Sequence, residues 1–106
     1  MYIKLNDMRN VVEFRMPFTG NSVFGQWKGT ELYCVFSYGS HFPMYIYDKN
    51  LDAWVGNSDK YSSTTSRHQS KCKPNSVKHW LNTDGMKGVI YRGGYVEHVV
   101  FRGEVA

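Results

Sequence analysis

The side chains most able to do chemistry are concentrated in one polar segment, residues 57–74. This segment contains seven Ser or Thr residues, and the longer stretch from Lys60 to Thr83 contains five cations and no Asp or Glu. Cationic and hydroxyl side chains hydrogen bond well to phosphates and carboxylates. The segment therefore predicts a surface that binds an anionic partner, with these binding residues: Lys60, Tyr61, Thr64, Thr65, Arg67, His68, Gln69, Lys71 and Lys73.

His68 is the residue in this segment that could act as a general base. Thr64 lies four residues before it, and Asp59 is the nearest acid. Nucleophilic catalysis needs a nucleophile, a base and a third group that orients the base, and the strained-turn motifs that supply such a nucleophile are missing here. The alternative is that His68 is a structural residue whose hydrogen bonds tie the hydroxyl cluster together. The sequence favours this alternative and a protein without catalytic activity.

The sequence predicts no metal and no cofactor. His68 and Cys72, four residues apart, are the only plausible pair of metal ligands at helical spacing, whereas a closed zinc site needs four ligands. The glycines are spaced as turn residues, and neither a phosphate-binding loop nor a dinucleotide-binding motif is present.

Composition predicts one small domain over residues 1–106. The chain is 42% hydrophobic, 16% aromatic and carries a net charge of +4, which suits a β-rich core that needs no disulfide framework. Cys34 lies in an apolar run, while Cys72 lies in the polar segment, which predicts an exposed thiol; whether the two form a bridge stays open. No apolar run approaches a membrane span and no signal peptide is seen, so we expect no membrane partner and a reducing cytoplasm.

Periodicity predicts the elements that position the polar segment. Apolar residues at helical spacing favour a helix over residues 8–15. Four short strands separated by tight turns then predict an antiparallel meander, over residues 22–28, 31–38, 42–47 and 53–55. Both faces of these strands are apolar, so we expect helices on one side and an aromatic surface on the other, built from Trp27, Tyr33, Tyr38, Tyr45, Tyr47 and Trp54. For any one of these rings, the sequence favours the alternative that it packs within the sheet, since aromatic residues are enriched in strands.

The second half of the chain predicts helices and one or two more strands. A helix over residues 66–73, capped at Thr64 or Thr65, would place Arg67 and Lys71 on one face. Residues 77–81 follow as a strand. Residues 83–92 fit a helix that ends at Gly93-Gly94, with a hairpin across these glycines as the alternative, and residues 95–101 alternate as a final strand. The predicted fold class is α+β: a twisted antiparallel sheet of four to six strands with two or three short helices.

Two stretches of the chain resemble a family of small bacteriophage-encoded proteins of unknown function. The stretches are Ser37-Tyr38-Gly39 and the Tyr-Ser-x-Thr-Thr-Ser-basic-His-Gln-Ser run at residues 61–70, with Trp54 before the polar loop. The resemblance spans roughly residues 18–80. It brings no activity, substrate or catalytic residue with it. It implies a viral protein made in the cytoplasm of a bacterial host, where it would bind host machinery.

Together these features predict a non-catalytic binding protein that docks on a host bacterial protein through the basic Ser/Thr-rich segment. Host takeover or inhibition of a defence system is the role that the resemblance implies. A nucleic-acid-binding protein is the alternative, with the same cations on DNA or RNA and Tyr61 or Trp80 stacking on bases. A small enzyme with a site based on His68 is the third possibility. The sequence leaves open whether the protein is a monomer or a homodimer.

Overall fold

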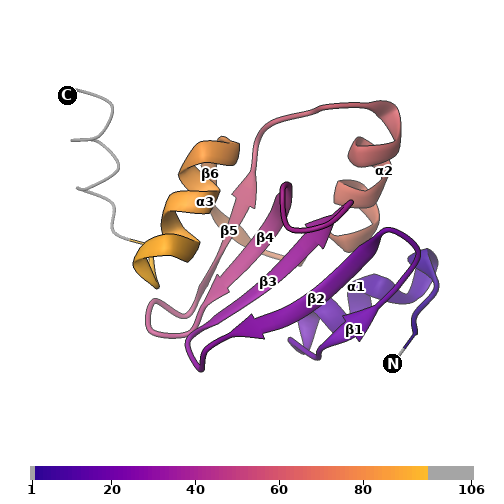
Figure 1. The fold of residues 1–106 in the computed structure, drawn as a ribbon. Coiled ribbons are helices and arrows are strands. Elements are labelled where there is room, and N and C mark those ends of the chain that lie inside the picture. The colour runs from indigo at the N-terminus through magenta and orange to yellow at the C-terminus, as the bar shows by residue number, and fades with distance from the viewer. Residues whose placement is uncertain (1, 96–106) are drawn as a thin grey trace.

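The computed structural model describes residues 2–95, which form a six-stranded sheet with its strands in chain order (Figure 1). The strands are β1 (Phe18–Thr19), β2 (Val23–Lys28), β3 (Leu32–Ser37), β4 (Pro43–Asp48), β5 (Ala53–Asn57) and β6 (Val77–Leu81). The helices are α1 (Met8–Glu13), preceded by the 3-10 turn η1 (Leu5–Asp7), α2 (Ser63–Cys72) and α3 (Thr83–Arg92). The predicted α+β fold class is therefore confirmed.

The sheet is mixed rather than purely antiparallel. Strands β1 to β5 pair antiparallel with their neighbours in sequence, which confirms the predicted meander. The last strand, β6, pairs parallel to β5. This direction follows from the connection, because α2 carries the chain back along the sheet before β6 begins.

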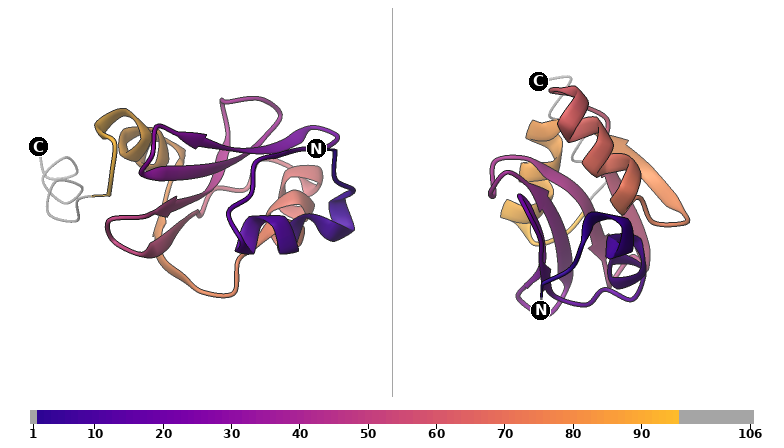
Figure 2. Two further views of the ribbon diagram at one scale, coloured as in Figure 1. Left: turned by 90° about the horizontal axis from the view of Figure 1, so that it is seen from below. Right: turned by 90° about the vertical axis from the view of Figure 1, so that its right-hand side faces the viewer.

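Helices cover both faces of the sheet. Tyr33 and Val35 of β3 pack in one cluster with side chains of α1 and α2, while Cys34 and Phe36 pack in a second cluster with α3. Figure 2 shows α1 and α2 on one side of the strands and α3 on the other. The predicted aromatic surface is therefore wrong for most of its rings: Tyr33 and Tyr45, for example, are 0% and 2% exposed beneath the helices, whereas Tyr38 stays exposed in the turn after β3.

Helix α2 begins earlier than predicted. Ser62 is the N-cap, in an extended conformation, and its hydroxyl accepts a hydrogen bond from the Thr65 backbone N–H at 3.1 Å. The predicted cap at Thr64 or Thr65 is wrong, since Ser62 satisfies a free N–H of the first turn.

The predicted exposure of Cys72 is also wrong. Its free thiol is buried, with Sγ 3.8 Å from Met8 Sδ of α1.

The helix over residues 83–92 is confirmed, and the alternative hairpin is wrong. The Asn82 side chain caps α3 by accepting a hydrogen bond from Gly85 N–H at 2.8 Å. Gly93 ends the helix in the left-handed region, with φ 83°, and its N–H donates to the Val89 and Ile90 carbonyls. The predicted strand over residues 95–101 falls, from residue 96 onward, outside the described residues. None of the helices in residues 2–95 is long and apolar enough to cross a membrane.

Candidate functional site

The nine predicted binding residues divide into an exposed and a buried set. Three side chains are buried, and they therefore build the site rather than contact a large partner: Thr65, His68 and Gln69. The other six are exposed: Lys60, Tyr61, Thr64, Arg67, Lys71 and Lys73. The predicted face of Arg67 and Lys71 is confirmed, because both lie on the outer side of α2, one turn apart.

A third cation, Arg9 of α1, lies beside the α2 face that carries Arg67 and Lys71, and the sequence did not reveal it. Arg9 donates from Nη2 to the Ser70 carbonyl at 3.1 Å, and a hollow of about 340 Å³ lies between Arg9 and Lys71. Within residues 2–95 no ion pair joins any of these cations to a carboxylate. We call Arg9, Arg67 and Lys71 the basic surface. Its positive charges are free to meet an external anion.

Two further cations lie at the ends of α2, Lys60 before its start and Lys73 directly after it. Lys60 donates from Nζ to Gln69 Oε1 at 3.3 Å, and Lys73 Nζ lies 5.9 Å from the centre of the Trp80 ring. Trp80 is 46% exposed, and the neighbouring Lys78 is also exposed. A half-exposed indole beside cations is typical of an interface anchor.

Gln69 holds α2 against the end of β5. Its side-chain Nε2 donates to the backbone carbonyls of Asn57 and Asp59 at 3.0 and 3.1 Å. The backbone carbonyl of Gln69 accepts from Tyr45 Oη at 2.7 Å. Asn57, which the sequence reasoning missed, is fully buried and donates from Nδ2 to Thr83 Oγ1 at 3.1 Å. These bonds explain why a segment so rich in polar residues packs on the sheet.

Asp59 belongs to the same network. Its carboxylate accepts the Thr83 backbone N–H at 2.8 Å, and this hydrogen bond is the main reason why the pKa of Asp59 is lowered. The Thr83 hydroxyl also accepts from Tyr61 Oη at 3.2 Å. The Tyr61 ring, 4.6 Å from Phe42 between ring centres, is therefore held in place although it is 63% exposed.

His68 connects α2 to the turn that follows β3. Its Nδ1 lies 2.7 Å from Ser37 Oγ, and its ring centre is 5.5 Å from that of Tyr38. The two stretches that carry the bacteriophage resemblance therefore meet in space. Neither Thr64 nor Asp59, the partners considered for catalysis, hydrogen bonds to His68 in the described structure. The bond to Ser37 supports the structural interpretation of His68, although Ser37 lies outside the predicted hydroxyl cluster.

The burial of His68 predicts a pH dependence of stability. Burial, reinforced by the charge of Arg67, lowers the pKa of His68, so the unfolded chain binds this proton more readily than the folded one. We therefore expect the stabilising contribution to be intact above about pH 6.5 and to fall as the pH drops below it, by at most about 1.4 kcal/mol per pH unit. Urea unfolding would give the free energy of unfolding at each pH in this range. Its slope against pH should be smaller in His68→Asn, which keeps a partner for Ser37 but does not titrate. Equal slopes would contradict the prediction.

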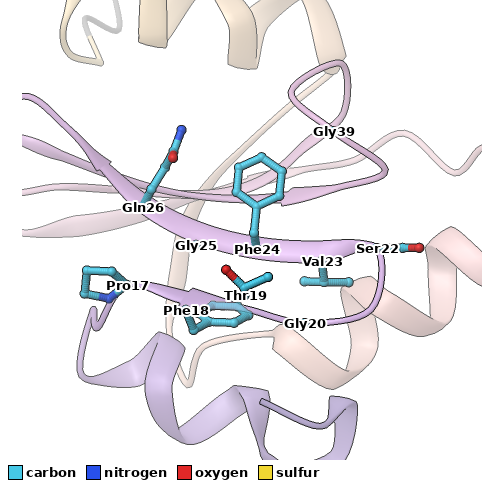
Figure 3. A pocket seen from close by; sticks show the side chains of 10 residues that line it. All are labelled: Pro17, Phe18, Thr19, Gly20, Ser22, Val23, Phe24, Gly25, Gln26 and Gly39. Atoms are coloured by element: carbon cyan, nitrogen blue, oxygen red, sulfur yellow. The ribbon is translucent and has the colours of Figure 1, made fainter. Parts of the chain in front are cut away.

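An open pocket of about 400 Å³ lies at the other end of the sheet, along β1 and β2 (Figure 3). Phe24 and Gln26 point to one side of β2, while Val23 and Phe18 point to the other. None of the described residues that line this pocket is charged, and none belongs to the predicted binding set. This pocket therefore has no positive charge for an anionic partner, whereas the surfaces around α2 do.

Within residues 2–95, no three His, Cys, Asp or Glu side chains are grouped closely enough to hold a metal ion. Comparison of the chain with protein-family models, with curated proteins and with solved structures finds no match. The bacteriophage resemblance therefore stays a prediction, and the geometry around α2 is what a functional proposal can rest on.

Proposed function

We propose that this protein is a non-catalytic binding protein that docks an acidic partner protein through α2 and its neighbours. The observation that carries the proposal is the basic surface. Arg67 and Lys71 are exposed one helical turn apart, Arg9 adds a third positive charge from α1, and none of the three is neutralised within residues 2–95. Charge arranged in this way steers and orients an acidic partner. The bacteriophage resemblance would make that partner a host protein.

The surroundings of His68 support binding over catalysis. Ser37, whose hydroxyl is hydrogen bonded to His68, is 0% exposed, so a substrate does not reach this oxygen. A serine nucleophile needs an exposed hydroxyl beside the base. His68 fits a structural role instead, because it fastens the second turn of α2 to the end of β3.

Charge reversal on α2 tests the proposal. We expect the double variant Arg67→Glu/Lys71→Glu to bind the partner at least about tenfold more weakly, because rim charges set the approach and register of an acidic protein. The partner would first be captured from bacterial lysate on immobilised protein and identified, and its affinity then measured by calorimetry. The control, Lys49→Glu/Lys87→Glu, reverses two exposed charges in the β4–β5 turn and on α3. Equal binding by both double variants would overturn the proposal.

Nucleic-acid binding is the second candidate, and the observation that favours it is the pair of exposed rings near the same cations. Tyr61 is 63% and Trp80 is 46% exposed, and Lys73 lies beside the Trp80 ring. Labelled oligonucleotides would show affinity that falls steeply with salt, since phosphate contacts release counterions. Such binding, lost in Arg67→Glu/Lys71→Glu, would favour this candidate over the acidic protein.

A further inference from the structure

The outer edge of β6 is open in the described structure. β6 is the last strand of the sheet and pairs with β5 alone among residues 2–95. Figure 2 shows β6 at the margin of the sheet. The Leu81 carbonyl accepts a hydrogen bond from Ser58 N–H at 2.7 Å, on the β5 side. Since successive residues of a strand direct their peptide groups to opposite sides, the N–H and C=O of Trp80 face the open edge.

The Trp80 side chain is fixed beside this edge. A Cβ at Gly56 would lie 2.7 Å from the indole, so the ring packs against β5 at a position where only glycine leaves room for it. Tyr45 contacts the ring edge-on, with centres 6.4 Å apart. The indole N–H has no hydrogen-bond partner among residues 2–95, and the Trp80 side chain is half exposed, so the indole remains available to a partner.

Two exposed cations lie beside this edge. Lys73 lies over the Trp80 ring, and Lys78 is exposed on β6. One carboxylate, that of Glu13 of α1, lies ahead of the strand, where it accepts a hydrogen bond from the Asn75 N–H. The sequence has no Asp or Glu between Lys60 and Thr83. An occupant of this edge would therefore meet an aromatic anchor, free peptide groups and the cations Lys73 and Lys78.

We propose that β6 is a docking strand for an extended acidic peptide segment, which pairs with the open edge at Trp80 and places its carboxylates near Lys73 and Lys78. Addition of a strand to a sheet edge takes its affinity from main-chain hydrogen bonds and its specificity from alternate side chains. This inference rests on the proposed function and specifies the form of the acidic partner. Free peptide groups favour a polypeptide over a nucleic acid, which has no matching row of N–H and C=O groups.

The test uses the ¹⁵N-labelled full chain and a short synthetic peptide of alternating Glu and Val. We expect the peptide to shift the Trp80 amide and indole resonances and to slow hydrogen exchange of the Trp80 amide at least about tenfold. The same peptide, N-methylated on the edge that would face β6, keeps its charge and should bind about tenfold more weakly, since it loses main-chain hydrogen bonds to the strand. Trp80→Ala should weaken binding, whereas Tyr91→Ala, which removes a 93% exposed ring of α3, should not.

Four results would overturn the inference. Slow exchange of the Trp80 amide without peptide would mean that the protein's own chain already pairs with the edge. Equal binding of the two peptides, with shifts confined to Arg67 and Lys71, would reject β6 as the docking strand but leave the proposed function standing. Tighter binding of oligothymidylate than of the acidic peptide would reject both. Binding of neither probe would reject the docking strand, and partner capture by the Arg67/Lys71 variants would then decide the proposed function separately.

Discussion

Replacing Gln69 by Leu is expected to lower the free energy of unfolding by about 3 kcal/mol. Leu has a similar volume, but it cannot donate to the Asn57 and Asp59 carbonyls or accept from Lys60. Each lost hydrogen bond contributes about 1 kcal/mol, and a carbonyl left buried without a donor costs about 1–3 kcal/mol more. The side chain is 2% exposed, so water replaces few of these bonds.

Urea unfolding followed by circular dichroism would measure this loss. The matched control is Ser70→Ala, the next residue on α2, whose side chain is exposed and whose carbonyl still accepts from Arg9. We expect the control to stay within about 0.5 kcal/mol of the unmodified chain. A Gln69→Leu protein as stable as the Ser70→Ala protein would show that α2 is held by its apolar contacts alone.

Gln69 also shows where sequence reasoning reaches its limit. The helical spacing of Arg67 and Lys71 correctly predicted a shared exposed face, because that relation depends on the local geometry of one helix. The burial of Gln69 depends on Asn57 and Asp59, which a loop and the start of the helix separate from it. A polar side chain in a polar segment carries no local sign that such partners exist, so Gln69 was placed among the contact residues.

The sequence predicted that a helix forms in this segment better than it predicted where the helix begins. The segment has a run of hydroxyl residues, and each of them is a competent cap. Which one becomes the N-cap depends on where the chain leaves β5, and here Ser62 meets that condition. The burial of Cys72 also depends on contacts outside the segment. Its polar neighbours in sequence predicted exposure, but its spacing from His68 places it on the inner face of α2 against Met8.

Alternation of apolar and polar residues predicted the sheet, but it did not predict that helices would cover both of its faces. Alternation correctly predicted two apolar faces, and Tyr33 and Cys34 do pack on opposite sides of β3. It could not show that α3 would pack on the second face, because the glycines at 85 and 88 made that helix uncertain against a hairpin. Once α3 covers the second face, the aromatic residues become core, and the search for a binding surface moves to α2 and the edge at β6.

Gly25, in the middle of β2, lies against side chains of both neighbouring strands, Phe18 of β1 and Tyr33 of β3. A Cβ at this position would lie 2.5 Å from Phe18 Cε1 and 2.5 Å from the Tyr33 hydroxyl oxygen. The Tyr33 hydroxyl donates to the Met16 carbonyl at 2.5 Å, so it is not free to move aside. The segment from α1, which carries Arg9, to β1 is therefore held to the sheet at a point where only glycine fits.

Gly25→Ala is accordingly expected to lower the free energy of unfolding by about 2–3 kcal/mol, since an added methyl group in a packed site forces its neighbours off their preferred positions. The matched control is Gly88→Ala on α3, where the new Cβ would meet only the mobile end of Arg92 at 3.1 Å. Removing a glycine from a helix interior should raise stability there by up to about 1 kcal/mol. Urea unfolding of the two variants should therefore move in opposite directions. A Gly25→Ala protein of unchanged stability would mean that Phe18 and Tyr33 can shift, and that α1 with Arg9 is held less firmly than the contacts indicate.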